Sequence, residues 1–419
     1  MSNFKSQFFN IMVERGFYNQ CTNESGFDSY LYECEQKGAP AVGYLGSDPT
    51  GDSLHVGHIV PLMMLRWFQK CGHKPLTLVG GATARIGDPS GKDKLRPFLS
   101  EETLKHNVEG LKKSFSKFLK FGDGATDAVM VDNWDWFKDI NYLAFLRDIG
   151  TYYSVNRMLT MDSVKARLDR EQPMSFLEFN YMLLQGYDFC ELYKKYGCRA
   201  QIAGSDQWGN ITSGTELGRR KYDVELFGFT SPIITDSAGK KMGKSEGNAV
   251  WINEEKLPSY DYFQYFRNIG DNEVGKCLRI FTDLPIDEIR RLETLKDQEI
   301  NEAKKILAFE ATKICRGEAE AEAARATAIK TFEQGGLGRE LPSINKSDIS
   351  GLSVLDAVVE IGWCASKGEV RRLIKQGGIK VNDQTISDEN YCFSAQDIKD
   401  GQIKIAQGKK KFGLIKISA

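Results

Sequence analysis

Residues 41–46 read AVGYLG, residues 47–51 read SDPTG, and a helical pattern then runs from Leu54 to Lys70. The first stretch has the short apolar composition of a buried strand, and the Pro and Gly of the second mark a turn. Pro61 falls inside the helical stretch, where it removes one backbone donor and is expected to kink the helix. A buried strand that leads through a tight turn into a helix predicts an α/β fold with a parallel sheet.

The alternation of strands and helices continues to about residue 250. Pro75–Val79 (PLTLV) and Ala128–Val131 (AVMV) are predicted strands, and Ala200–Ala203 and Pro232–Thr235 are weaker candidates. Ser175 to Tyr196 is predicted as a helix that is apolar nearly all round over its first four turns and is therefore buried.

The second part of the chain has a different composition. Residues 255–330 are charged and rich in alanine, which predicts helices alone. A linker follows around Gly335-Gly336 to Ser350. From Leu352 onward, two helical stretches and short strands such as Ile379–Val381 and Ile403–Ile405 predict a small α+β unit.

The bulk composition of the 419 residues is that of a globular protein, with 41% apolar and 27% charged residues. A net charge of −1 leaves no global field for a polyanion, so any nucleic-acid surface has to be local. The nine cysteines form no C-x-x-C pair, which predicts a reducing, cytoplasmic compartment and no protein-bound metal. No signal peptide and no apolar run of membrane-spanning length is seen, so no membrane contact is expected.

The turn after the first strand carries two of the four histidines of the chain. His55 and His58 stand three residues apart at the start of a helix, with Gly57 between them, so both imidazoles share one face of the first turn. Helix N-termini attract anions, and imidazole donors there can stabilise charge that develops in a transition state. The alternatives are a capped helix with two surface histidines, or a metal pair, for which no acidic or Cys ligand stands at suitable spacing.

A Gly-rich loop about 190 residues later carries the sequence Lys241-Met242-Gly243-Lys244-Ser245. Two lysines three apart in such a loop suit a clamp on a polyphosphate. Taken alone, the loop is also compatible with solvated surface lysines.

Together the two motifs, H-x-G-H after Pro-Thr and the later K-M-x-K-S, resemble those of the class I aminoacyl-tRNA synthetases, with Gly243 where Ser is commonest. The resemblance implies ATP as substrate, with Mg²⁺ carried by ATP. It implies catalytic roles for Thr50, His55, His58, Lys241 and Lys244. It implies ATP contacts for Gly46, Asp48, Gly57, Asp206 and Lys244.

Three further stretches resemble the tyrosyl-tRNA synthetases within that class. They are residues 80–92 (GGATARIGDPSGK), 181–189 (YMLLQGYDF) and 204–210 (GSDQWGN). The resemblance assigns a tyrosine pocket to Tyr44, Asp88, Tyr181, Gln185, Asp188 and Gln207. Tyr181, Gln185 and Asp188 lie on one face of the buried helix, where polar groups need partners. A ligand or an internal network would both meet that need.

The tail also resembles a known module. Asp356 to Asn382 is similar to the S-four-like RNA-binding domain, and residues 352–419 carry 11 basic and 8 acidic residues, a net charge of +3. The implied phosphate contacts are Lys367, Arg371, Arg372, Lys375 and Lys380. An ordinary solvated helix face is the alternative.

The predicted architecture is a Rossmann-like parallel sheet with helices on both faces, then an all-α domain and a small α+β module. The expected boundaries are 1–250 for the catalytic nucleotide-binding domain, 251–335 for a helical anticodon-binding domain, 336–351 for a linker and 352–419 for the RNA-binding domain. A helical insertion at about 120–195 is expected to form a homodimer interface.

The resemblance implies a tyrosine–tRNA ligase reaction. Tyrosine is activated by ATP to tyrosyl-adenylate and pyrophosphate, and is then transferred to the 3′-terminal ribose of tRNA(Tyr). A tryptophanyl ligase is one rival, disfavoured by Tyr44, Asp188 and the tail. A non-catalytic RNA-binding protein is the other, disfavoured by the intact histidines and lysines.

Overall fold

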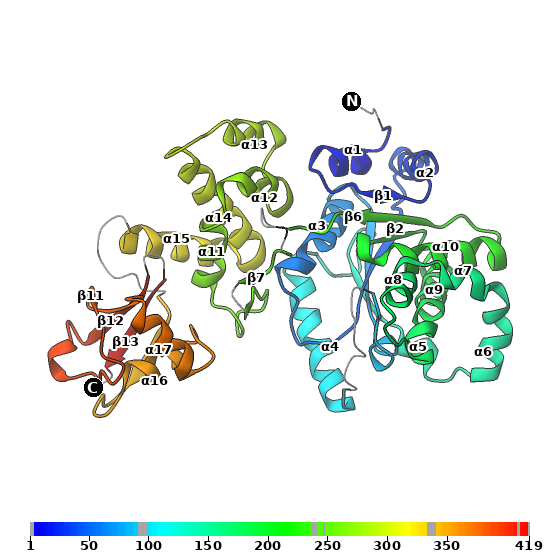
Figure 1. The fold of residues 1–419 in the computed structure, drawn as a ribbon. Helices are drawn as coiled ribbons and strands as arrows, with labels where there is room; N and C mark the ends of the chain where they lie inside the picture. Colours follow the sequence, from blue (N-terminus) through cyan, green and yellow to red (C-terminus); the bar gives the residue numbers. More distant parts are fainter. Residues whose placement is uncertain are drawn as a thin grey trace. The chain divides into compact units, whose positions relative to one another are not determined.

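The computed structural model describes residues 4–90, 99–235, 239, 241–245, 248–332, 341–408 and 411–417. The chain forms two compact units. The first comprises Met1–Leu257 and Tyr265–Arg316, and the second comprises Pro258–Gln264 and Gly317–Ala419. Each unit has its own sheet (Figure 1).

The sheet of the first unit has the order β1-β6-β5-β2-β3-β4. Its strands are β1 (Gln20–Cys21), β2 (Val42–Ser47), β3 (Lys74–Val79), β4 (Val129–Asp132), β5 (Ala200–Gly204) and β6 (Phe227–Ser231). The short edge strand β1 is antiparallel to β6, and the others run parallel. The predicted parallel sheet is therefore confirmed. Because β3 lies on one side of β2 and β5 on the other, the topological switch point falls between β2 and β5.

Helices cover both faces of this sheet. A side chain at Gly43 would meet Phe68 of α3 (Val56–Lys70), so α3 lies on that face. The next residue, Tyr44, points to the opposite face and packs its ring on Phe189 of α9 (Phe176–Tyr196) at 5.2 Å between centroids. The helices α1 (Gln7–Glu14) and α2 (Glu24–Lys37) join α3, and α10 (Trp208–Tyr222) joins α9.

Five further helices of the described chain precede α9: α4 (Glu101–Ser116), α5 (Trp134–Phe137), α6 (Tyr142–Asp148), α7 (Val155–Leu159) and α8 (Asp162–Asp169). A second group of helices follows the small hairpin of β7 (Lys244–Ser245) and β8 (Asn248–Ala249). These are α11 (Ser259–Arg267), which continues from the second unit, α12 (Val274–Phe281), α13 (Ile286–Glu293) and α14 (Ile300–Arg316). With α15 (Glu318–Phe332) of the second unit, they confirm the all-helical stretch predicted for 255–330.

The second unit contains a sheet of order β11-β10-β12-β13-β9. Its elements are β9 (Ser343–Lys346), α16 (Val354–Glu360), α17 (Lys367–Lys375), β10 (Ile379–Val381), β11 (Gln384–Thr385), β12 (Gln402–Gln407) and β13 (Lys411–Ile417). The predicted α+β unit is confirmed. Within the expected linker, however, residues 343–346 form β9, which pairs in parallel with β13 because Ile344 fills the core of this unit.

Two local predictions are wrong. Residues 232–235 are not a strand, because β6 lies earlier, at the fully buried sequence FGFTS, and Pro232 has no N–H to extend the ladder. The helix α9 exists as predicted, with Ser175 as its N-cap, but its first turn is only partly buried. Phe176 is 68% exposed, whereas Glu178 in the same turn is 3% exposed.

No helix within the described ranges is both long enough and apolar enough for a bilayer crossing.

Gly110 of α4 is predicted to be essential for the packing of the segment that leads into α3. A Cβ at this position would lie 1.9 Å from the carbonyl oxygen of Asp52, which is backbone and cannot turn away. We expect Gly110→Ala to destabilise the first unit by about 1–3 kcal/mol through overpacking. Thermal unfolding followed by tryptophan fluorescence checks this, with Gly150→Ala as control because its Cβ would meet only Leu146, at 3.8 Å. Equal melting temperatures for the two variants would contradict the prediction.

Candidate active site

Two of the carboxylates singled out in the sequence, Asp48 and Asp206, lie at the carboxyl ends of neighbouring parallel strands. Asp48 follows β2, Gly80 follows β3, Asn133 follows β4 and Asp206 lies in the turn after β5. Open α/β sheets bind ligands at this edge, beside the switch point. Asp48 and Asp206 are thus brought to one edge of one sheet.

The two histidines build the N-terminus of α3. The Nδ1 atom of His55 accepts a hydrogen bond from the N–H of Gly57 at 3.0 Å, and Nδ1 of His58 accepts from the N–H of His55 at 3.3 Å. The rings lie 3.9 Å apart between centroids, with 34° between their planes. Because each Nδ1 is an acceptor, a neutral ring carries its proton on Nε2.

The lysine loop packs directly on this helix start. Gly243, with φ of +96°, approaches so closely that a Cβ there would lie 2.6 Å from the backbone nitrogen of Gly57. After the loop, the N–H of Val56 donates to the carbonyl of Val250 at 2.9 Å. The two motifs, about 190 residues apart in the chain, are therefore in contact. Lys241 is exposed, and the side chain of Lys244 lies outside the described part.

A hydrogen-bond network begins at Asp48. Its carboxylate accepts from the Thr83 hydroxyl at 2.7 Å and from the Tyr181 hydroxyl at 3.0 Å. Gly80 makes this approach possible, since a Cβ there would lie 2.0 Å from Asp48 Oδ1. Burial and the negative charge of Asp48 raise the pKa of Tyr181 well above its usual value, so its hydroxyl stays a donor.

The network continues to Asp188, a carboxylate that is only 2% exposed. Asn133 donates to Asp188 Oδ2 at 3.0 Å and to the Thr83 hydroxyl at 3.0 Å, and Trp136 donates to Asp188 Oδ1 at 2.8 Å. Burial raises the pKa of Asp188 well above its usual value; the two donors lower it, and the charges of Asp48 and Asp132 raise it further. These partners leave Asp188 rigid on the inner wall of the site.

Tyr44 and Gln201 hold two buried polar atoms without partners among the described residues. The Tyr44 hydroxyl and Gln201 Oε1 form no hydrogen bond, although the residues are 0% and 2% exposed. Tyr44 and Gln201 are paired across β2 and β5, so their side chains point to the same face at the switch point. Burial and the charge of Asp188 keep the pKa of the Tyr44 hydroxyl well above its usual value. Such buried polar atoms at the switch point indicate a polar ligand.

Asp88 anchors a second cluster. Its carboxylate accepts from Gln207 Nε2 at 2.8 Å and from the N–H of Ser90 at 3.0 Å. Asn210, which is buried, reaches Gln207 Oε1 at 3.2 Å. The side chain of Asp206 is exposed. Desolvation by the surrounding protein raises the pKa of its carboxyl group, and the positive charge of Lys241 lowers it. The two clusters and the lysine loop therefore border the same edge.

Comparison with known proteins identifies the family. The family described as tRNA synthetases class I (W and Y) matches residues 36–333, and the tyrosine–tRNA ligase SYY-like C-terminal domain matches residues 332–415. A tyrosine–tRNA ligase of Rhodospirillum rubrum is 52% identical over 99% of this chain and 98% of its own length. The chain belongs to the tyrosine–tRNA ligase family. A relative from Wolbachia pipientis of Culex pipiens is 53% identical, with the same coverage.

The solved structures of this family share the fold. A C-terminally truncated mitochondrial tyrosyl-tRNA synthetase of Aspergillus nidulans superimposes with a TM-score of 0.69 at 30% identity, over 78% of this chain and 94% of that one. A tryptophanyl-tRNA synthetase of Aeropyrum pernix gives 0.52 at 16% identity, which shows the fold alone.

The remaining predicted residues of the ligase lie around the same edge. Gln185 is buried on α9 between Tyr181 and Asp188, as the helical spacing predicts. Gly46, at the end of β2, is exposed, and Thr50 is exposed in the turn beyond it, with its N–H bonded to the carbonyl of Asp48 at 2.8 Å. Gly91 and Lys92, the end of the quoted 80–92 stretch, lie outside the described residues.

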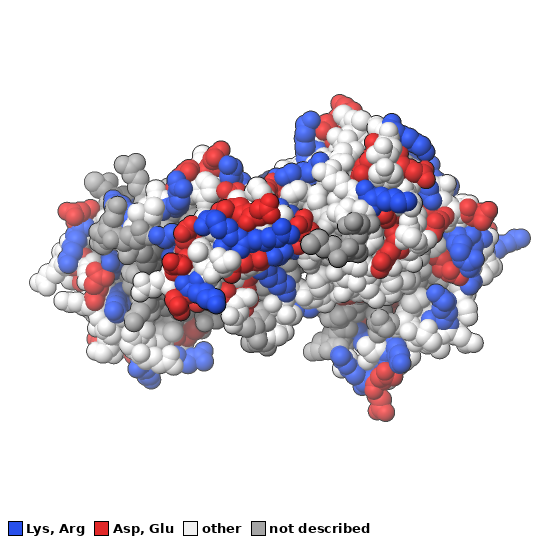
Figure 2. All heavy atoms as spheres, turned by 90° about the horizontal axis from the view of Figure 1, so that it is seen from above, with Lys and Arg blue, Asp and Glu red and all other residues white. Residues whose placement is uncertain are grey.

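Four of the five predicted RNA contacts lie on the outer face of α17, in the second unit, and the fifth, Lys380, is half-buried in β10. Lys367, Arg371, Arg372 and Lys375 are exposed, while Val370 and Ile374 of the same helix are buried. Asp356 pairs with Lys367 at 2.5 Å, and Glu389 pairs with Lys375 at 3.1 Å and Arg371 at 3.7 Å. Neighbouring acids thus offset part of this charge. On the face drawn in Figure 2, the two signs are likewise intermixed.

Sequence reasoning missed Thr83, Asn133, Trp136, Gln201 and Asn210. The available signal was position, since Asn133 and Trp136 follow a predicted strand at the edge where ligands bind. Thr83 and Asn210 lay inside quoted motifs but were assigned no role. Gln201 was an amide within an otherwise apolar strand, which is a warning of a buried polar contact.

Two threonines give a matched test of the network. Thr83→Val leaves both Asp48 and Asn133 short of a partner, so we expect a loss of about 1–3 kcal/mol in unfolding free energy. Thr77→Val, in β3, removes a buried hydroxyl that has no partner among the described residues, so it is expected to be neutral or stabilising. Urea unfolding of both variants measures the difference. If Thr77→Val proved the more damaging, the network would not stabilise the site.

Proposed function

We propose that this chain ligates tyrosine to tRNA, with the phenol of tyrosine placed between Tyr44 and Asp188. The observation that carries the proposal is the buried Tyr44 hydroxyl near Asp188, which has no partner among the described residues. A substrate hydroxyl can both donate and accept, so it satisfies both groups. Phenylalanine would fill the same space and leave the Tyr44 hydroxyl unsatisfied, which costs about 1–3 kcal/mol.

The ammonium of the substrate is assigned to Asp88, Tyr181 and Gln185, which offer carboxylate, hydroxyl and amide oxygens. Gln207, bonded to Asp88, is assigned to the carboxyl region of the substrate. Held in this way, the substrate carboxylate faces the histidine motif. Its in-line attack on the α-phosphate of ATP would form tyrosyl-adenylate and release pyrophosphate, before tyrosine passes to the 3′-terminal ribose of tRNA(Tyr).

The ATP half of the site works through positioning and charge. The Nε2 donors of His55 and His58, with Lys241, Lys244 and Thr50, are proposed to stabilise the charge that grows on the departing diphosphate. Gly46, Asp48, Gly57 and Asp206 are the proposed ATP contacts. Mg²⁺ enters with ATP as part of the substrate. No side chain has to act as covalent nucleophile or general base.

The tail is proposed to hold tRNA through Lys367, Arg371, Arg372, Lys375 and Lys380. The helical stretch that begins at residue 251 would hold the anticodon stem. The proposed compartment is the cytoplasm, because all nine cysteines are free thiols, including buried Cys190, Cys198 and Cys277.

A homodimer is proposed through the helical insertion at about 120–195. Several of its large apolar side chains are exposed: Leu143 by 74%, Phe176 by 68%, Val155 by 59% and Tyr142 by 57%. Apolar exposure of this extent is unusual on a monomer and is typical of an interface.

The substrate assignment is tested by pyrophosphate exchange with tyrosine and with phenylalanine. We expect exchange with tyrosine to be strongly preferred in the unsubstituted enzyme. Tyr44→Phe should lower kcat/KM for tyrosine about 10-fold, without a matching loss for phenylalanine, because one hydrogen bond to the phenol is removed. Tyr30→Phe, on the opposite face of the sheet, is the control. Equal exchange of both amino acids by the unsubstituted enzyme would contradict the assignment of tyrosine as substrate.

The dimer is tested by a charge in the exposed apolar surface. Leu143→Glu should shift the mass in light scattering from dimer to monomer, because a carboxylate would be desolvated at the interface. Val13→Glu, at an apolar residue of α1 that is 37% exposed, should leave the mass unchanged. A monomeric unsubstituted protein would refute the proposal.

A further inference from the structure

The segment that follows the lysine loop is bound to the histidine motif along its backbone. Residues 250–257, here named the strap, begin with Val250, whose carbonyl accepts from the N–H of Val56. The N–H of Ile252 donates to the carbonyl of Leu54 at 2.9 Å, and Trp251 forms a bridge with His55. The indole of Trp251 also meets the His55 imidazole edge-on, at 6.0 Å between centroids. The root of the lysine loop and the start of α3 are thus one locally paired structure.

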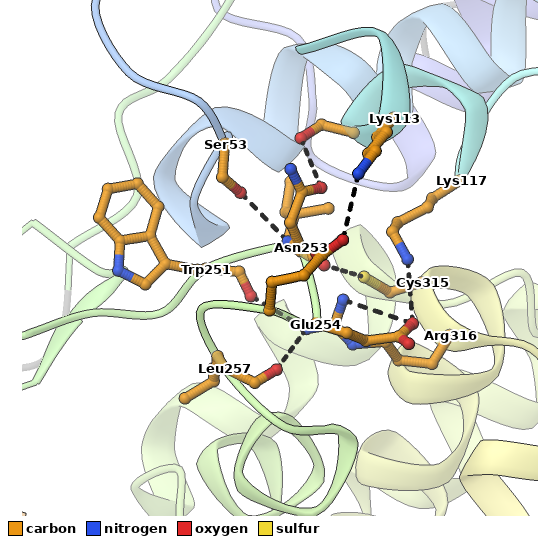
Figure 3. A network of polar contacts seen from close by, with 12 residues as sticks. Ser53, Lys113, Lys117, Trp251, Asn253, Glu254, Leu257, Cys315 and Arg316 are labelled. Atoms are coloured by element: carbon orange, nitrogen blue, oxygen red, sulfur yellow. Dashed lines mark hydrogen bonds and ion pairs between the residues drawn. The ribbon is translucent and has the colours of Figure 1, made fainter. Parts of the chain in front are cut away.

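Asn253 holds this strap through a buried set of hydrogen bonds (Figure 3). Its Nδ2 donates to the carbonyls of Asp52 at 2.9 Å and Gly110 at 3.1 Å, and its Oδ1 accepts from the Ser114 hydroxyl at 2.9 Å. Its own N–H donates to the Ser53 hydroxyl at 3.1 Å. The residue is 4% exposed. One amide therefore ties the strap both to the residues before the histidine motif and to α4.

The other contacts of the strap either join it to the helical part of the unit or lie at the surface. Arg316 of α14 donates to the carbonyls of Trp251 at 3.2 Å and Leu257 at 2.9 Å, which fixes the two sides of the strap to the helical part. The ion pairs of Lys117 with Glu254 and Lys113 with Glu255 are partly or fully solvated. Exposed pairs of this kind contribute about 0–1 kcal/mol. The buried amide of Asn253 adds a side-chain link to the backbone bonds that hold the strap to the histidine side.

We propose that Asn253 is a positioning residue for tyrosine activation, which holds the root of the lysine loop at the distance from His55 and His58 that the transition state needs. The inference rests on the proposed function, since it assigns the loop to the diphosphate of ATP. A displacement of about 1 Å in such a group can cost on the order of 100-fold in rate. Asn253 bonds to none of the tyrosine-pocket residues, so tyrosine binding is left unchanged.

The test compares Asn253→Ala with Gln69→Ala. Gln69 is an amide near the other end of α3 that donates to the carbonyls of Lys120 at 2.8 Å and Thr126 at 2.9 Å and accepts from the N–H of Lys120. It makes a similar number of bonds far from the lysine loop, so it reports the cost of losing a structural amide. We expect Asn253→Ala to lower kcat of pyrophosphate exchange at least 30-fold, with less than a twofold change in the Kd of tyrosine measured by equilibrium dialysis. Gln69→Ala should change neither.

A second variant and a second measurement keep the inference open to refutation. Ser114→Ala removes one bond to Asn253 and is expected to lower kcat about 3- to 10-fold in a fold that tolerates the change. Hydrogen exchange of residues 249–257 should be faster in Asn253→Ala than in Gln69→Ala, because the N–H of Ile252 loses its protection. An unchanged kcat in folded Asn253→Ala, or a parallel loss of tyrosine binding, would overturn the inference. Absence of tyrosine-dependent exchange in the unsubstituted enzyme would instead refute the proposed function.

Discussion

The buried carboxylate of Asp188 and its two donors constrain the whole amino-acid side of the site. A carboxylate removed from water needs partners, and Asn133 and Trp136 supply them from the segment after β4. Asn133 also donates to Thr83, which donates to Asp48, which accepts from Tyr181 on the same helix as Asp188. The bonds close a circuit through α9 and the ends of β2, β3 and β4. Each member is held from two sides, which makes the pocket rigid before any ligand arrives.

The side of the site that carries the histidines is held together in a different way. There the histidines are half-buried or exposed, and backbone hydrogen bonds between the strap and the start of α3 provide the order. The close contact of Gly243 with Gly57 is possible because Gly243 has no side chain. The α9 side of the site thus rests on a buried side-chain circuit, whereas the histidine side rests on backbone pairing and one buried amide.

The sequence was informative wherever the physics was local. Apolar runs bounded by Gly and Pro located β2, β3 and β4, and helical spacing placed Tyr181, Gln185 and Asp188 on one buried face. The failures involve long-range partners. Residues 232–235 were assigned to a strand that in fact ends at Ser231, and the strand β9 was hidden in an expected linker because its partner, β13, lies 68 residues later. Asn133 and Asn253 were missed because nothing near them in the chain shows what they hold.

A second feature of the site is a pair of buried polar atoms that have no partner among the described residues. Tyr44 and Gln201 lie opposite each other on β2 and β5, and both keep a buried oxygen unsatisfied among the described residues. Each such atom costs about 1–3 kcal/mol, which a purely structural core would remove by substitution to an apolar residue. Their retention at the switch point makes sense if a bound phenol restores the missing hydrogen bonds. The hydrogen-bonding groups that the fold leaves unsatisfied would then be the groups that recognise the substrate. The same groups would destabilise the empty enzyme and contribute to the free energy of binding.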